Sequence, residues 1–269
     1  MFLAISSLMF LLAANFINGR QGKAEFRQGM NELDSKVRQV INDVSNGYYP
    51  SEQNFRCYAT DTAGDPPRVD QTSSNALGTN KGCVFLGKVI SFGHTLEGDW
   101  GYNIFTVVGR QYVGSQKEAK VPTKFSDARP KTVYTPRTGF SLIEQVMMKW
   151  GMKITDFYDN ESGESISGLG FYTSFGKYET GNTLVSGSQE VITLPIKLPE
   201  GGDTTAMANA IDTQTVSVGD SPTANRNIDA VLCIEGNNGQ WGTLKFGGNG
   251  GQRLTTRIQV YNNKPGISA

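Results

Sequence analysis

The sequence predicts an α+β fold in which one long N-terminal helix, half membrane anchor and half amphipathic, packs on an antiparallel β-sheet domain. Three observations support this prediction. Residues 1–17 contain no charged side chain, and helix-compatible sequence continues without a proline to about Asn46. Apolar residues of the second part recur at helical spacing. Residues 51–269 hold most of the 32 glycines and many Thr, Val, Tyr and Phe, a mixture typical of short strands and turns.

The uncharged segment 1–17 is interpreted as a transmembrane helix. It would rise about 25 Å, slightly less than the ~30 Å hydrocarbon core of a bilayer. A cleaved secretory signal would begin with basic residues and stop at a small-residue cleavage site, whereas this segment has no basic residue and helix-compatible sequence continues for about thirty more positions. We therefore expect a retained single-pass anchor in the cytoplasmic membrane, followed by an extracytoplasmic domain.

Residues 18–47 are expected to form the amphipathic half of the same helix, ending at Gly47. Glu32 with Lys36 and Asp34 with Arg38 have the spacing of i,i+4 ion pairs. We expect the apolar stripe to pack on the chain's own downstream domain. The alternative is a coiled-coil stalk, for which about two heptads are short. The stripe consists of Phe26, Met30, Leu33, Val37, Val40, Ile41 and Val44.

The region 51–269 is predicted to be one β-rich globular domain. Residues 84–92 and 102–108 flank a turn region and predict an antiparallel hairpin. Further strands are predicted at 152–157, 170–175, 190–198, 228–235, 242–246 and 254–260. The last three of these strands form a meander, because short Gly- and Asn-rich turns join them.

Two segments of this domain have a different expected structure. Residues 141–150 fit a short helix with Ser141 as N-cap and Glu144 at the capping-box position, and the alternative is a strand. Residues 200–227 are rich in Thr, Ser, Gly, Asp and Asn, and we expect a long exposed loop there.

The three cysteines are interpreted from their surroundings. Cys57 and Cys83 bracket a Gly-, Pro-, Ser- and Thr-rich loop, and we expect a disulfide between them, which suits an oxidising compartment. The alternative is two unpaired, buried thiols. Cys233 lies in an apolar run and is expected to be a free, buried thiol. No Cys-x-x-Cys spacing points to zinc.

The sequence contains no recognisable catalytic site, and we expect no enzyme activity, no metal and no cofactor. The single histidine, His94, has no nucleophile motif nearby. Oxygen donors at Asp156, Asp159 and Glu164 do not follow the order of a known calcium loop. The 25 basic and 25 acidic residues are interspersed, so nucleic acid is not an expected partner.

The uncharged N-terminal run, its amphipathic continuation, the stop at Gly47-Tyr-Tyr-Pro50 and the disulfide-capable β domain together resemble type IV pilins and the pseudopilins of type II secretion systems, in particular minor pseudopilins. The stretches 230–236 and 244–260 are similar to the closing strands of that family. The family's basic leader, ending in Gly and followed by Phe-Thr-Leu-x-Glu, does not occur in the sequence.

The resemblance implies a structural subunit of a type IV pilus or a type II secretion-like filament, present at the cell surface after assembly. Its partners would be other pilin or pseudopilin subunits and membrane lipid, both reached through the N-terminal helix. A membrane-anchored surface adhesin or ligand-binding module is the alternative, and a secreted β-rich enzyme is a further one. The residues expected in the membrane or filament core are Leu3, Ile5, Leu8, Phe10, Leu11, Leu12 and Phe16.

Overall fold

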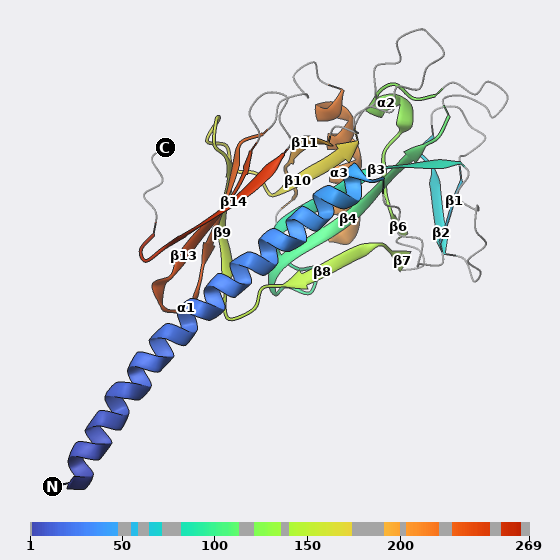
Figure 1. Ribbon diagram of the computed structural model, residues 1–269. Coiled ribbons are helices and arrows are strands. Elements are labelled where there is room, and N and C mark those ends of the chain that lie inside the picture. Colours follow the sequence, from blue (N-terminus) through green and yellow to red (C-terminus); the bar gives the residue numbers. More distant parts are fainter. Residues whose placement is uncertain are drawn as a thin grey trace.

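The computed structural model describes residues 2–47, 55–58, 65–71, 82–112, 121–135, 140–173, 191–199, 203–220, 228–247 and 254–264, and for residues 2–19 it describes the backbone alone. These residues form one long N-terminal helix, two shorter helices and fourteen strands (Figure 1). All of the strand pairs are antiparallel.

Two main sheets make up the body. The six-stranded sheet has the order β11 (Val191–Ile196), β10 (Gly168–Thr173), β3 (Cys83–His94), β4 (Trp100–Arg110) and β5 (Lys131–Thr132), with β8 (Ile143–Met147) also paired to β4. The four-stranded sheet has the order β14 (Thr255–Tyr261), β13 (Trp241–Gly247), β12 (Ala230–Glu235) and β9 (Lys153–Asp159). Two small sheets pair β1 (Phe55–Tyr58) with β2 (Arg68–Gln71), and β6 (Tyr134–Thr135) with β7 (Phe140–Ser141).

Helix α1 (Phe2–Ser45) lies across both main sheets with its second half, while its N-terminal end runs beyond them (Figure 1). All seven residues of the apolar stripe are buried, and Val37 and Val44 are completely inaccessible. They share one core with side chains from both sheets, including Phe92 of β3 and Phe246 of β13. The helix ends where the stripe ends, with Gly47 at a positive φ of 63°.

Polar contacts fix both sides of α1. On one side Lys36 pairs with Glu144 of β8 at 2.6 Å, and on the other the Arg38 guanidinium donates to the Thr256 carbonyl of β14 at 2.9 Å. The expected Asp34–Arg38 pair forms at 2.8 Å. The expected Glu32–Lys36 pair is wrong, because each of its members pairs with a residue more than one hundred positions along the chain, Glu32 with Lys149 and Lys36 with Glu144.

The six-stranded sheet is covered on both faces. The face opposite α1 packs against α2 (Phe125–Ala128) and α3 (Thr204–Gly219), and their shared core contains Phe105, Tyr172 and Ile211. Because both faces are buried, β4 shows no apolar and polar alternation, and all of its residues after Trp100 are buried. Asp220, directly after α3, accepts backbone N–H bonds from Phe125 at 2.6 Å and from Ser126 at 2.9 Å, which ties α3 to the start of α2.

Cys57 of β1 and Cys83 of β3 form a disulfide, as predicted, and Cys233 is a free, buried thiol. The bridge joins the small β1–β2 sheet to the six-stranded sheet. Burial is the main reason that the pKa of the Cys233 thiol is raised, so this thiol stays protonated and weakly nucleophilic.

The predicted fold class, an α+β fold with a membrane-anchoring helix half, is wrong. The described chain is mainly antiparallel β-sheet with a single long N-terminal helix. Among the residues described with their side chains, no helix is long and apolar enough to cross a membrane. From Arg20 onward, α1 carries charged residues on its exposed sides. The predicted location as a single-pass protein of the cytoplasmic membrane is corrected on the same finding.

Two local predictions also change. The predicted helix at residues 141–150 is instead the end of β7 and the strand β8, because pairing with β4 from Phe105 to Gly101 overrides the local capping signal. The predicted loop at residues 200–227 contains helix α3. Its buried residues Ala208, Ile211 and Thr215 lie at helical spacing, and Asp203 accepts the Ala206 N–H at 2.7 Å. The hairpin β3–β4 and the meander β12–β13–β14 are confirmed.

We predict that Val37→Asp lowers the free energy of unfolding of the full chain by about 3 kcal/mol or more, because it places an unpaired charge at a fully buried position. Chemical denaturation followed by circular dichroism measures the change. Asn31→Asp, which adds the same charge at an exposed position of the same helix, is the control and should change stability little. Equal stability of Val37→Asp and the wild type would show that the stripe is not held in the core.

We predict that Cys57→Ala/Cys83→Ala lowers the free energy of unfolding by about 3 kcal/mol, because the bridge closes a loop with a sequence separation of 26. A reducing agent should destabilise the wild type by a similar amount and leave the double variant unchanged. Denaturation of the wild type and of the double variant, each with and without reductant, gives the four free energies of unfolding to be compared. A wild-type protein insensitive to complete reduction would contradict the prediction.

Candidate functional site

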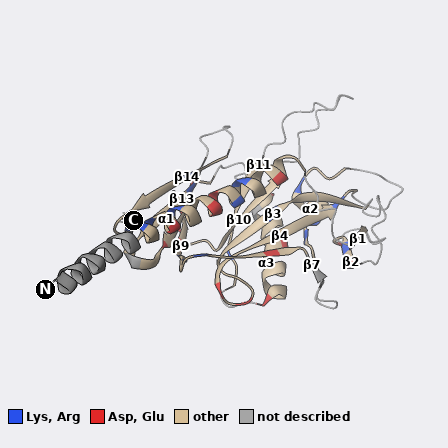
Figure 2. Cartoon of the chain, turned by 60° about the horizontal axis from the view of Figure 1, so that its bottom comes forward, with Lys and Arg blue, Asp and Glu red and all other residues tan. Residues whose placement is uncertain are grey.

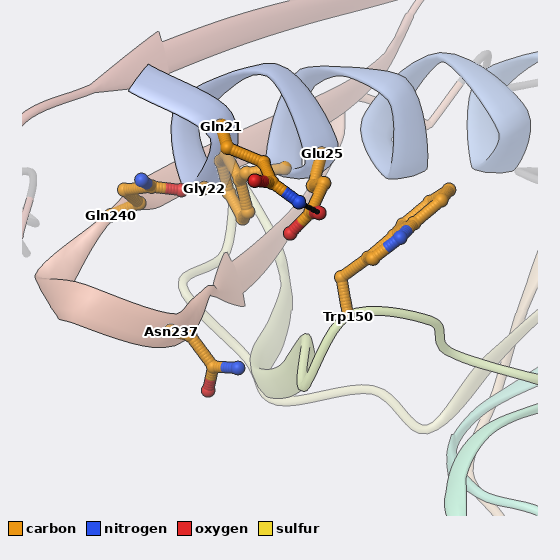
Figure 3. A pocket seen from close by; sticks show the side chains of 7 residues that line it. Gln21, Gly22, Glu25, Trp150, Asn237 and Gln240 are labelled. Carbon is orange, nitrogen blue, oxygen red and sulfur yellow. Dashed lines mark hydrogen bonds between the residues drawn. The ribbon is translucent and has the colours of Figure 1, made fainter. Parts of the chain in front are cut away.

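The candidate site is a cleft where α1 leaves the body. Its volume is about 210 Å³. Figure 3 shows Gln21 and Glu25 on α1 at one side, with Trp150 pointing toward the helix from the turn after β8. The other side is the connection between β12 and β13, which contains the short 3-10 turn η1 (Asn237–Gly239). The lining residues are Gln21, Gly22, Glu25, Phe26, Trp150, Asn237 and Gln240.

Close packing at Phe26 sets the floor of the cleft. Phe26 is buried, and a Cβ atom on Gly236 would lie 2.3 Å from its ring, so only glycine lets the β12–β13 connection approach the helix this closely. Gln240 adds a polar contact to the α1 backbone. In the amide orientation that satisfies both of its groups, Gln240 donates to the Gly22 carbonyl and accepts from the Lys23 N–H, each at 3.2 Å.

Trp150 has an unusual backbone conformation. Its φ is 54°, in the left-handed region that bulky residues rarely occupy, and Gly151 follows with a φ of 67°. The Met152 N–H donates to the Lys149 carbonyl at 3.1 Å, so these residues close a tight turn between β8 and β9. Strained residues of this kind persist where the surrounding structure holds them, and they are concentrated at functional sites. The turn aims the indole ring at α1 beside Glu25 (Figure 3).

The charges at the cleft are unevenly paired. The Lys149 ammonium bonds to Glu32 at 3.0 Å and lies 5.7 Å from the centre of the Trp150 ring. Its hydrogen bond to the Glu32 carboxylate is the largest cause of that group's lowered pKa. Glu25 accepts from the Gln21 amide at 2.8 Å, and within the described residues no Lys or Arg pairs with it. The half-buried Glu25 carboxylate therefore keeps capacity for a cation.

A second groove lies along the same side of α1, next to β8. It contains the Lys36–Glu144 ion pair and the exposed Met147 side chain, which is 60% accessible. Tyr102 lies at its base, and burial is the main cause of the raised pKa of this phenol. The groove is thus lined by apolar side chains, such as Val146 and Met147, and by two ion pairs, Lys36–Glu144 and Glu32–Lys149.

The sequence candidates for catalysis and metal binding, His94, Asp156, Asp159 and Glu164, do not line either groove. His94 lies in the β3–β4 turn, with its ring 4.2 Å from that of Trp100. Within the described part of the chain, no three His, Cys, Asp or Glu side chains lie close enough together to hold a metal ion. Two of the carboxylates in this segment have protein partners: Glu164 pairs with Lys197 at 2.9 Å, and Asp159 accepts a hydrogen bond from the Glu161 N–H at 2.9 Å. The Glu25 carboxylate and the Trp150 ring, which line the cleft, are groups that can bind a cation.

The structure separates the predicted site residues into three groups. The seven stripe residues are buried against the two sheets. Cys57 and Cys83 form a structural bridge in the β1–β3 region. The side chains of the predicted membrane or filament-core residues lie outside the described part, and only their helical backbone is seen. Those residues are Leu3, Ile5, Leu8, Phe10, Leu11, Leu12 and Phe16.

Sequence reasoning missed the cleft. Its residues come from three segments that are distant in the sequence, and Trp150 was expected at the end of a helix. The one available signal was the Trp150-Gly151 pair directly after an apolar segment, since such a glycine is typical of a tight turn. Nothing in the sequence indicated that Asn237 and Gln240 would lie beside Glu25.

Compared with known protein families, curated proteins and solved structures, the chain has no match.

Proposed function

We propose that this protein is a structural subunit of a filament, of the pilin or pseudopilin kind, which assembles with other subunits through the N-terminal part of α1. The observation that carries the proposal is the division of this single helix. It contains 44 residues, and its packing against the two sheets begins at Phe26. The part before the cleft extends beyond the body (Figure 1).

The composition of that extension fits helix packing between subunits. Residues 1–17 carry no charge and include several Leu, Ile and Phe residues. Each large apolar side chain buried between neighbouring helices contributes about 1.5–3 kcal/mol. Several such side chains per subunit, repeated along an assembly, provide a driving force for polymerisation without any catalytic group.

The body of the subunit is suited to a structural role. α1 is fixed to both main sheets by its apolar stripe and by ion pairs along its edges, so a load on the extension passes directly into the core. One of these pairs, between Lys88 of β3 and Asp43 near the end of α1, is largely shielded from solvent and has a distance of 2.5 Å. The disulfide further restrains the part of the body around β1 and β3.

We predict that Leu8→Asp reduces incorporation into filaments at least tenfold and leaves the body folded, because a charge at an apolar helix contact costs more than about 1.4 kcal/mol. Tagged full-length protein is produced in its source cells, and the filaments sheared from them are assayed by immunoblotting. Circular dichroism of the purified chain reports folding. Val121→Asp is the matched control, since it adds a charge at an apolar residue that is 46% exposed on the body.

The proposal is overturned if the wild-type chain is missing from sheared filaments and remains monomeric when purified. That result would favour the ligand-binding alternative. Equal incorporation of Leu8→Asp and the wild type would show that assembly does not use the N-terminal part of α1.

A further inference from the structure

The described part of α1 presents opposite charges on its two sides at the point where it leaves the body. A helix turns by about 100° per residue, so positions can be compared with Phe26, which points into the core. On this scale Lys23 and Arg27 lie about 60° and about 100° to one side. Glu25 and Glu32 lie about 100° and about 120° to the other. Figure 2 shows both signs of charge along this part of the helix.

Contacts with the sheets show which part of the body each charged side of α1 faces. The basic side faces β14, where Arg38 donates to the Thr256 carbonyl. The carboxylate side faces the β8–β9 turn, where Glu32 bonds to Lys149. We call the first the basic side, defined by Lys23 and Arg27, and the second the acidic cleft, defined by Glu25 and Trp150 with the other cleft residues.

The basic side has exposed cations available for an external partner. Lys23 and Arg27 are both exposed, and neither forms an ion pair with any described residue. They are four positions apart on the helix, so their side chains project from the same edge. The flexible stems of Lys and Arg allow such groups to reach into a neighbouring recess.

The acidic cleft has the chemistry to receive one of these cations. The Glu25 carboxylate can accept charge-assisted hydrogen bonds from an ammonium or a guanidinium. The Trp150 ring offers the aromatic face that binds cations best. Lys149 of the same chain already lies over this ring, so the Glu25 carboxylate is the main acceptor for an incoming cation. The Asn237 and Gln240 side chains line the rest of the recess, and its volume of about 210 Å³ has room for one side chain.

We propose that neighbouring copies of this chain pack with their α1 helices side by side, and that the basic side of one copy meets the Glu25–Trp150 cleft of the next, with Lys23 or Arg27 entering the cleft. This inference rests on the filament function proposed above and names the contact that orients the subunits. The basic side and the acidic cleft differ and lie on opposite sides of α1. A growing assembly therefore always keeps one basic side free at one end and one acidic cleft free at the other. Contacts of this heterologous kind produce open, helical assemblies when they do not close into a ring.

The test uses two charge-reversal variants of the full chain, Glu25→Lys and Lys23→Glu/Arg27→Glu. Each brings like charges together at every contact between its own copies. We expect each variant alone to self-associate about tenfold more weakly than the wild type at low salt, as measured by sedimentation velocity. High salt should lower the self-association of the wild type toward that of the variants, because salt screens exposed charges.

Mixing the two variants is the decisive experiment. In alternating order, the basic side of the Glu25→Lys chain meets an unchanged Glu25, and the reversed side of the other chain meets the new lysine. Both contacts then have opposite charges, so we expect the equimolar mixture to recover most of the wild-type association. Recovery between separate chains cannot come from a repaired fold within one chain. Glu161→Lys and Lys124→Glu are the matched controls, since both alter exposed charges away from α1 and should associate like the wild type.

The outcomes separate this inference from the function on which it rests. Unchanged association of both charge variants, together with a loss in Leu8→Asp, would overturn the side-by-side contact and leave the filament function standing. Weak association of both variants without recovery in the mixture would also overturn it. If the wild-type chain does not assemble under any of these conditions and is missing from sheared filaments, the filament function fails and the contact fails with it.

Discussion

Burial of one apolar stripe of α1 across two sheets is the interaction on which the rest of the structure depends. The six-stranded and four-stranded sheets share no strand, and their cores meet under the stripe from Phe26 to Val44. Removing water from that stripe favours the helix and both sheets at once, since each covers apolar surface of the others. The position of the helix then determines the cleft, the charged sides of α1 and the direction in which its N-terminal part leaves the body.

Local patterns predicted the elements whose own residues determine their structure. The stripe at helical spacing marked the buried side of α1, and the glycine-bounded apolar runs marked the β3–β4 hairpin and the final meander. The loop composition between Cys57 and Cys83 indicated their bridge. In each case the signal lies within a few residues of the feature, or in the composition of one short segment.

Features that depend on distant partners were missed or misassigned. Residues 141–150 carry a capping signal for a helix, but β4 offers residues 143–147 five residues of backbone pairing, which decides in favour of a strand. Residues 204–219 look like a loop by composition, yet α3 gains a buried face against the six-stranded sheet. Glu32 and Lys36 are well spaced for each other but bond to Lys149 and Glu144 instead. The cleft belongs to the same category, because three separate segments build it.

The continuity of α1 has a mechanical consequence. A single helix whose second half is clamped and whose first half projects behaves as a lever with its pivot near Phe26. From Phe26 to Phe2 the helix is about 36 Å long, so a tilt of about 5° at the pivot moves the tip by about 3 Å. Sub-ångström repacking of the core around Met30 and Met152 is thus amplified at the distant end, where shifts of that size change which neighbouring side chains meet.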